Sequence, residues 1–174
     1  KAPDGLAALA KAKADGRIGH IGFSFHDSLS VFKDIVDGWE DWEFCQVQYN
    51  YMDEGYQACT AGIEYAASKG ISSIVMEPLR GGSLANVPDE VRAIFASWGK
   101  PRMAAEWAFR HVLDREEVVT ALSGMGTVFQ LWENAAVASA ARVNSITNKE
   151  RAILDRARDW FNARMPVPCT SCGY

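Results

Sequence analysis

Hydrophobic residues follow two alternating patterns along the chain. Short apolar runs bounded by glycines or polar residues are typical of buried parallel strands, and longer stretches with apolar residues every three or four positions are typical of helices. The short runs predict strands at residues 19–25, 43–49, 70–76 and 118–123. The longer stretches predict helices at about residues 4–15, 27–38, 55–69 and 147–164, with others after Pro88, Pro101 and Thr127.

Residues that favour the start of a helix occur at five positions: Asp27, Pro88, Pro101, Thr127 and Thr147. Aspartate is a common helix cap, and a proline fits the first helical position because its missing N–H costs nothing there. The two threonines are followed three residues later by Gln130 and Glu150, which is the spacing of a capping box. We therefore expect a helix to begin at each of these positions.

The order of the elements predicts the fold class. Strands that alternate with helices form right-handed βαβ units and a parallel sheet covered by helices. A closed (β/α)8 barrel of eight units normally needs about 250 residues, whereas this chain has 174 residues and holds four units preceded by a helix. The fold is therefore α/β, and it is either a small open sheet or the last four βα units of a TIM-type barrel plus a C-terminal helix.

Composition and charge narrow the class of protein. Hydrophobic residues make up 48% of the chain and charged residues 23%, which argues against intrinsic disorder. The net charge of −4 without a Lys/Arg-rich run argues against a nucleic-acid partner, and no apolar run is long enough to span a membrane. Four cysteines are too few for a disulfide scaffold, so we expect a cytoplasmic protein. The missing initiator Met predicts a processed chain or a fragment.

Polar residues gather where the first two predicted strands end. Ser24 and His26 close the first strand, and Gln46, Gln48 and Asn50 alternate with apolar residues on the second. Ligands of parallel α/β folds bind at the carboxyl ends of strands. Amide side chains are costly to bury unless they are paired, so they are either site residues or a polar layer that is satisfied internally.

The last two predicted strands end in glycine-rich loops. Residues 77–82 read Glu-Pro-Leu-Arg-Gly-Gly, which is either the rim of a site or a loop closed by a Glu77–Arg80 ion pair. Residues 123–127 read Ser-Gly-Met-Gly-Thr and lead into the capped helix. A glycine-rich turn that enters a helix N-terminus presents free N–H groups, which favour an anion.

Four segments together carry a family resemblance. GHIGFSFHD, FCQVQYNYMD, IVMEPLRGG and ALSGMGTVFQLWEN resemble, in order and spacing, the last four strands of the aldo-keto reductases. The closest branch has a cysteine-rich, ferredoxin-like tail. This family is a (β/α)8 barrel that transfers hydride between a nicotinamide cofactor, NADP or NAD, and a small-molecule carbonyl substrate. The resemblance implies that residues 1–165 are the C-terminal half of such a barrel.

The resemblance also assigns cofactor contacts position by position. Ser24 and Gln46 match residues that contact the nicotinamide amide, and Glu77, Pro78 and Leu79 match the segment along the pyrophosphate. The adenosine end is matched by Ser123, Gly124, Met125, Gly126, Thr127, Gln130, Glu133 and Asn134. Two departures stand out: Met76 replaces an aromatic residue that often stacks on the nicotinamide, and residues 123–134 hold no Lys or Arg. The choice between NAD and NADP therefore stays open.

No catalytic residue is assigned to this chain. In the aldo-keto reductases the catalytic Asp, Tyr, Lys and His come from the first four strands, which have no counterpart here. Tyr49 and Tyr51 lie on the segment that matches the sixth strand, so they do not match the catalytic acid. We expect the 174-residue chain by itself to be inactive.

The last residues, 166–174, change character and contain Cys169 and Cys172 in a CxxC pattern. The resemblance implies that they begin the ligand set of a [4Fe–4S] cluster in a full-length protein, because a cluster needs four thiolates. Two cysteines alone are equally half a zinc site or a redox pair, and for this chain the first expectation is an unliganded tail. Two other functions therefore remain alongside the reductase: a non-catalytic binding or assembly module, and an electron-transfer adaptor that uses the cysteines.

Half a barrel would leave surfaces uncovered. The strands at 19–25 and 118–123 would have unpaired backbone edges, which invite pairing with another chain. We also expect Ile21, Phe23, Val47 and Ile74 to lie on an inner face that lacks its opposing strands. The sequence therefore predicts a homo-oligomer or association with a separate N-terminal half.

Overall fold

The computed structural model describes residues 5–164 and contains one four-stranded parallel sheet. The strands β1 (Gly22–Ser24), β2 (Phe44–Gln48), β3 (Ser72–Met76) and β4 (Val118–Ala121) lie in the order β1-β2-β3-β4. Each strand pairs in parallel with the next one along the chain. The four predicted strands are thus confirmed, although each is shorter than its apolar run.

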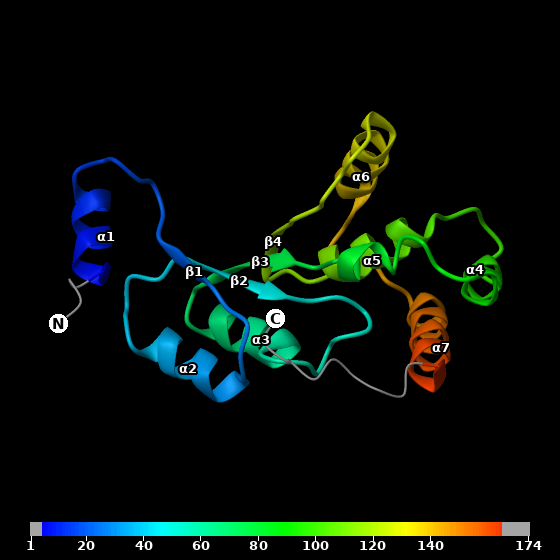
Figure 1. The fold of residues 1–174 in the computed structure, drawn as a ribbon, viewed down its shortest axis with the longest axis horizontal. Helices are drawn as coiled ribbons and strands as arrows, with labels where there is room; N and C mark the ends of the chain where they lie inside the picture. The colour runs from blue at the N-terminus through cyan, green and yellow to red at the C-terminus, as the bar shows by residue number, and fades with distance from the viewer. Residues whose placement is uncertain (1–4, 165–174) are drawn as a thin grey trace.

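One helix precedes the strands, and the others connect them or follow the last one. They are α1 (Gly5–Ala14), α2 (Leu29–Asp37), α3 (Cys59–Ser68), α4 (Asp89–Ala96), α5 (Ala104–Leu113), α6 (Val128–Ala140) and α7 (Asn148–Arg164), with a short 3₁₀ helix at Arg80–Gly82. Helices α2 and α3 lie along one face of the sheet, α4 packs against α7, and α6 extends away from the sheet (Figure 1). The order β1-α2-β2-α3-β3-α4-α5-β4-α6-α7 is that of four consecutive βα units followed by a helix.

Three predicted helix starts are wrong. The N-cap of α2 is Ser28 rather than Asp27, whose carboxylate instead accepts a hydrogen bond from the Ser28 N–H. Helix α5 begins at Ala104 rather than at Pro101, because Met103 is extended and supplies the first helical carbonyl. Helix α3 begins at residue 59 instead of 55, because the left-handed backbone at Gln57 interrupts any earlier turn.

The capping boxes behave differently at the two predicted sites. At the start of α7 the box is complete: the Glu150 N–H donates to Thr147 Oγ1, and the Thr147 N–H donates to Glu150 Oε2 at 2.8 Å. At the start of α6 the Gln130 N–H donates to Thr127 Oγ1, but Gln130 Oε1 accepts from Gly126 N. Both helices start where predicted, and α6 has its glycine-rich turn tied to its first turn.

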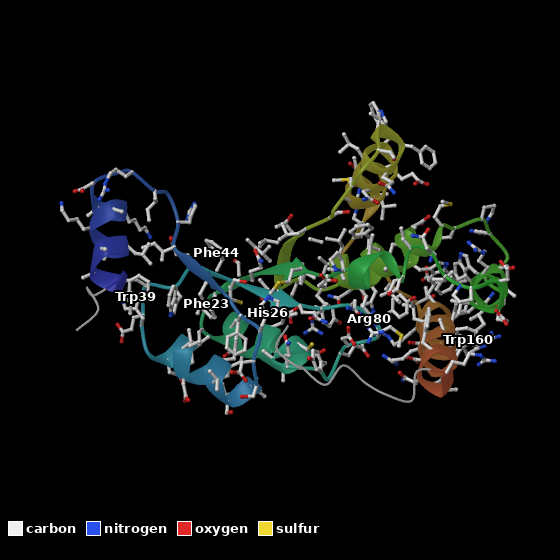
Figure 2. The ribbon with its side chains drawn as sticks, viewed as in Figure 1. Phe23, His26, Trp39, Phe44, Arg80 and Trp160 are labelled. Atoms are coloured by element: carbon white, nitrogen blue, oxygen red, sulfur yellow. The ribbon has the colours of Figure 1, made fainter. Side chains whose placement is uncertain are left out.

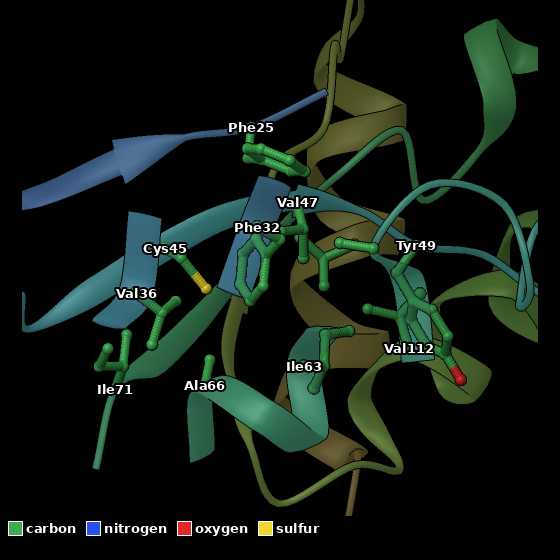
Figure 3. Close-up of a cluster of buried hydrophobic side chains, with 12 residues drawn as sticks. Phe25, Phe32, Val36, Cys45, Val47, Tyr49, Ile63, Ala66, Ile71 and Val112 are labelled. Atoms are coloured by element: carbon green, nitrogen blue, oxygen red, sulfur yellow. The ribbon is translucent and has the colours of Figure 1, made fainter. Parts of the chain in front are cut away.

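The two faces of the sheet differ in what covers them. Cys45 and Val47 of β2 point into a buried cluster with Phe32 of α2, Ile63 of α3 and Val112 of α5 (Figure 3). The prediction that Val47 and Phe23 lie on an uncovered inner face is wrong. Val47 is buried and Phe23 packs against this cluster. Successive side chains of a strand point to opposite faces of the sheet, and these two point to the face that the helices cover.

The same prediction also named Ile21 and Ile74, and it is wrong for the first and right for the second. Ile21 is buried, so it does not lie on an uncovered face either. Ile74 alternates with the buried Ser73 and Val75 and is only partly buried, so its face is the open one. The open face of the sheet therefore carries Gln46, Gln48, Ile74 and Met76, and only part of it is apolar.

A second buried cluster lies beyond the strand ends, between α4, α5 and α7. Its largest members are Tyr51, Phe95, Trp107 and Phe161. Beside it the Arg102 guanidinium stacks over the Trp107 ring at 4.3 Å and donates to Glu150 Oε1 at 2.8 Å. Glu150 is only 2% exposed, so this ion pair joins the start of α7 to the segment before α5 inside the fold.

The sheet has two open edges, as the sequence predicts. Among the described strands, β1 pairs only with β2 and β4 pairs only with β3. Helix α6, which follows β4, has no buried residue and exposes large apolar side chains: Val128, Phe129, Leu131 and Trp132. Phe129 and Trp132 are 66% and 72% exposed, which marks an apolar surface without a partner in the described chain.

Candidate functional site

Three side chains from the first three strands, Ser24, Gln46 and Met76, form a row on the sheet near the carboxyl ends of β1 and β3. Ser24 of β1 lies opposite Gln46 of β2 in the parallel register. Gln46 Nε2 lies 3.5 Å from Ser24 Oγ and 3.6 Å from Met76 Sδ of β3. This row lies on the open face, so the predicted residues Ser24 and Gln46 are brought together beside Met76. His26 follows on the loop after β1 and is exposed (Figure 2).

Asn50, which the sequence placed among the site candidates, is satisfied inside the protein. Its side chain is fully buried, accepts from the Met52 and Asp53 N–H groups, and donates to Asp53 Oδ2 and to the Glu77 carbonyl. Of the two alternatives that the sequence left open for the amides, a ligand-binding residue or a polar group satisfied inside the protein, the second is correct for Asn50. Asn50 thereby joins the loop after β2 to the loop after β3.

Asp53 organises these loops, and the sequence analysis missed it. Its carboxylate accepts from Gln48 Nε2 and Asn50 Nδ2, each at 3.0 Å, and lies 3.2 Å from Arg80 Nε. Arg80 thus forms an ion pair with Asp53, while the Glu77 carboxylate accepts from Gly81 N at 2.7 Å. Glu77 and Arg80 thus each contact a further partner beyond the Glu77–Arg80 pairing that the sequence offered as one alternative.

The loop after β3 has an unusual backbone. Glu77, Arg80, Gly81 and Gly82 all have φ values between 48° and 90°. Glycine adopts this left-handed conformation freely, but other residues pay for it. The hydrogen bonds of Asn50 and Glu77 hold the two strained residues in place, so the loop has a fixed shape beside the open face.

A cavity of about 770 Å³ lies at the carboxyl ends of β3 and β4. Its walls are the loop after β3, the turn after β4 and the first half of α6. Most of the predicted cofactor residues line it: Glu77, Pro78, Leu79, Ser123, Gly124, Met125, Thr127, Gln130, Glu133 and Asn134. Gly126 contributes its N–H to Gln130. Ser24 and Gln46 stand outside the lining, but Met76 lines the cavity and contacts Gln46.

The turn after β4 is fastened to α6 from two sides. Asn134 Nδ2 donates to Ser123 Oγ at 3.0 Å, and Gln130 Oε1 accepts from Gly126 N at 2.8 Å. These bonds bring the turn onto the first helical turns, with the α6 N-terminus at the cavity. The positive end of the helix dipole favours a negatively charged group there.

A second cavity, of about 550 Å³, has polar walls from Tyr49, Glu54, His111, Asp114 and Arg115, among others. Buried His111 stacks on the Tyr49 ring, with centroids 5.1 Å apart. Burial, and to a lesser degree the nearby arginines, lower the pKa of His111 to about 3, although Glu54 Oε1 lies 3.4 Å from Nε2. His111 is thus neutral at physiological pH and packs against its neighbours.

The cysteines give no metal site within residues 5–164. Cys45 and Cys59 are free and buried, and burial raises the pKa of the Cys59 thiol to about 12. Over that same range no group of three or more His, Cys, Asp or Glu side chains is arranged to hold a metal ion. The predicted metal residues Cys169 and Cys172 lie outside the described residues.

Within the described part, no helix is both long and apolar enough to cross a membrane.

Fold and cavity together define the class of protein. Four consecutive parallel βα units with a cavity at their carboxyl ends form part of a TIM-barrel-type α/β fold. A sequence profile of the Aldo/keto reductase family matches residues 2–156. The chain belongs to the aldo/keto reductase family, as the sequence resemblance predicted. No curated protein sequence matches the chain.

Solved structures show the same fold. The holo form of aldo-keto reductase AKR11C1 from Bacillus halodurans has a TM-score of 0.67 and 20% identity over 87% of this chain and 54% of its own. An aldo-keto reductase from Klebsiella pneumoniae in complex with NADPH has a TM-score of 0.66 and 20% identity, with coverages of 87% and 52%. A putative 2,5-diketo-D-gluconic acid reductase B has a TM-score of 0.66 and 24% identity, with coverages of 87% and 50%. The chain therefore spans about half the length of these structures.

Proposed function

We propose that this chain is the cofactor-binding half of an oxidoreductase that transfers hydride between a nicotinamide cofactor and a small carbonyl substrate. The observation that carries the proposal is the cavity of about 770 Å³, which collects residues from three separate segments at the strand ends. Membership of the aldo/keto reductase family supports this activity. The length of the matched structures supports residues 1–165 as the second half of a barrel.

The residues present fit a dinucleotide. The cavity volume lies in the range of small-molecule sites, about 300–1,000 Å³. The start of α6 offers N–H groups to a pyrophosphate, and no atom lies within 4 Å of a Cβ built on Gly124. In this proposal Ser24 and Gln46 bind the nicotinamide amide, the 77–79 loop follows the pyrophosphate, and residues 123–134 hold the adenosine. The bound cofactor would supply or accept the hydride.

The proton donor must come from outside the described chain. Tyr49 is buried against His111, and burial raises the pKa of its phenol. Burial also raises the pKa of Tyr51, which lies in the core beside Phe95. Neither tyrosine lines the larger cavity. We therefore infer that a separate N-terminal half provides the catalytic acid and that the 174-residue chain is inactive without it.

Replacing Gln46 by alanine in the full-length protein is expected to weaken NADH and NADPH binding about three- to tenfold. The reason is the loss of one hydrogen bond of roughly 0.5–1.5 kcal/mol to the nicotinamide amide. Fluorescence titration of both reduced cofactors measures it. The matched control is Asn162→Ala, which removes an exposed amide on α7 and should change neither dissociation constant. Unaltered cofactor binding by Gln46→Ala would contradict the role given to Gln46.

The open edges favour an assembly role beside catalysis. Backbone groups of β1 and β4 face outward at the two ends of the sheet, and α6, which follows β4 in the chain, exposes Phe129 and Trp132. We infer that an N-terminal half of the barrel, or a second copy of the chain, pairs with these edges.

The free thiols of Cys45 and Cys59 agree with the predicted cytoplasmic location. The [4Fe–4S] cluster and the electron-transfer role stay predictions, because Cys169 and Cys172 lie outside the described residues.

A further inference from the structure

The second cavity, of about 550 Å³, is separate from the proposed cofactor site and shares no lining residue with the larger cavity. Its walls come from the loop after β2, the start of α3, the end of α5, the residues before β4, the loop after α6, and α7. Its volume lies in the range of small-molecule sites, about 300–1,000 Å³. Hydride transfer gives this cavity no role.

Three buried side-chain atoms in its walls make no hydrogen bond with the protein: His111 Nε2, Thr60 Oγ1 and Arg115 Nε. His111 is only 6% exposed, and its Nε2 lies 3.4 Å from Glu54 Oε1 without forming a hydrogen bond. The Tyr49 phenol lies close to Thr60 and Arg115, but neither atom reaches hydrogen-bond geometry with it. A buried polar group without a hydrogen bond destabilises a fold, so three such atoms around one cavity indicate that a ligand supplies their partners.

The charges around the cavity are already compensated. Three carboxylates of its walls each lie beside an arginine, in the pairs Glu54–Arg158, Asp114–Arg151 and Glu117–Arg115. Burial lowers the pKa of His111 to about 3, so its ring is neutral at physiological pH. The remaining carboxylate, that of Glu116, is exposed. A charged ligand would therefore lose its hydration without meeting an unpaired counter-charge inside, which favours an uncharged ligand.

The hydrogen-bonding capacity of the three atoms narrows the chemistry further. Arg115 Nε carries a hydrogen and can only donate. The Thr60 hydroxyl donates or accepts, and His111 Nε2 does one or the other according to the tautomer of the ring. A hydroxyl group both donates and accepts. Several hydroxyls on one molecule therefore match all three atoms, whichever tautomer His111 adopts.

We propose that the second cavity binds a small, uncharged molecule that carries several hydroxyl groups. One ligand oxygen accepts from Arg115 Nε, and two further hydroxyls pair with Thr60 Oγ1 and His111 Nε2. Water offers the same donors and acceptors and is the competing occupant. This site goes beyond the proposed hydride transfer and does not depend on it.

Hydrogen–deuterium exchange of the full-length protein, titrated with myo-inositol and with erythritol, tests the proposal. At least one of the two should slow amide exchange in residues 54–60 and 111–117, and the concentration dependence gives its dissociation constant. Thr60→Val removes the hydroxyl at nearly constant shape and should weaken binding about three- to tenfold. Arg115→Lys keeps a positive charge beside Glu117 but lacks the Nε–H group, and should weaken binding by a similar factor. The control Ser68→Ala removes an exposed hydroxyl of α3 outside the cavity and should change nothing.

The other outcomes contradict the proposal. If neither polyol slows exchange in these segments, the cavity holds water only. Protection confined to residues 77–86 and 122–134 would place the polyol in the larger cavity instead. Displacement of the polyol by inorganic phosphate or by choline would overturn the uncharged class of ligand, and binding that both variants leave unchanged would overturn the contacts with Thr60 and Arg115. A failure of NADH to bind would contradict the proposed function alone, since the two cavities share no residue.

Discussion

Replacing Arg102 by methionine is expected to lower the free energy of unfolding by about 3 kcal/mol. Methionine keeps the apolar stem between Trp98 and Trp107 but removes the charge that pairs with Glu150. Glu150 would then be left almost fully buried with only Thr147 and Arg110 nearby. Removing one partner of a buried pair costs about 3–5 kcal/mol, and we expect the lower end because those two contacts remain.

The matched control is Arg92→Met, which breaks the exposed ion pair with Asp89 on α4. Exposed pairs contribute roughly 0–1 kcal/mol, so this variant should unfold almost as the parent does. The double variant Arg102→Met, Glu150→Gln should recover part of the loss, because no charge is left unpaired. Urea unfolding of the four proteins measures the differences. Equal stability of Arg102→Met and Arg92→Met would contradict the role of the buried pair.

Acidification is expected to destabilise the protein through His111. In the folded state its pKa is lowered to about 3, chiefly by burial, whereas the unfolded value is about 6.5. Above pH 6.5 the imidazole is neutral in both states, and below it the unfolded chain takes up a proton that the folded protein does not. Stability therefore falls as pH falls from 6.5 toward 3, by at most about 1.4 kcal/mol per pH unit, or about 3 kcal/mol between pH 6.5 and 4.

Urea unfolding of the parent and of His111→Gln at several pH values between 4 and 8 isolates this contribution. Glutamine does not titrate, so the stability of the variant should depend less steeply on pH below 6.5. His26→Gln is the control, because His26 is exposed on the loop after β1 (Figure 2). Parallel pH profiles for the parent and His111→Gln would show that His111 titrates alike in the folded and unfolded chain.

The sequence predicts the elements well because their patterns are local. Apolar runs bounded by glycine mark the four strands, and the Thr147–Glu150 spacing marks the start of α7. The direction of strand side chains is harder to predict, because a parallel strand is apolar on both faces. Val47 and Phe23 were therefore assigned to the wrong face. Pro101 fails as a helix start because Met103 is extended and supplies the first helical carbonyl. Arg102, between them, pairs with Glu150, which lies 48 residues further along the chain.

The candidate site is predictable where its residues follow strand ends. The cavity gathers the turn after β4 and the loop after β3, as the family resemblance implied. Asp53 was missed because its role depends on contacts with Gln48, Asn50 and Arg80, which only the folded loops bring together. An acidic residue five positions after the polar end of β2 was the available signal. The exposed apolar side chains of α6 were also missed, although four of the five residues at 128–132 are apolar and the signal was in the sequence.

Hydrogen–deuterium exchange of the full-length protein, with and without NADH, tests the central claim that this half of the barrel holds the cofactor. Binding should slow amide exchange in residues 77–86 and 122–134, which form the walls of the larger cavity. The segments around the second cavity, at residues 54–60 and 111–117, should exchange at unchanged rates. Protection that is absent from 77–86 and 122–134 while NADH is bound would contradict the account.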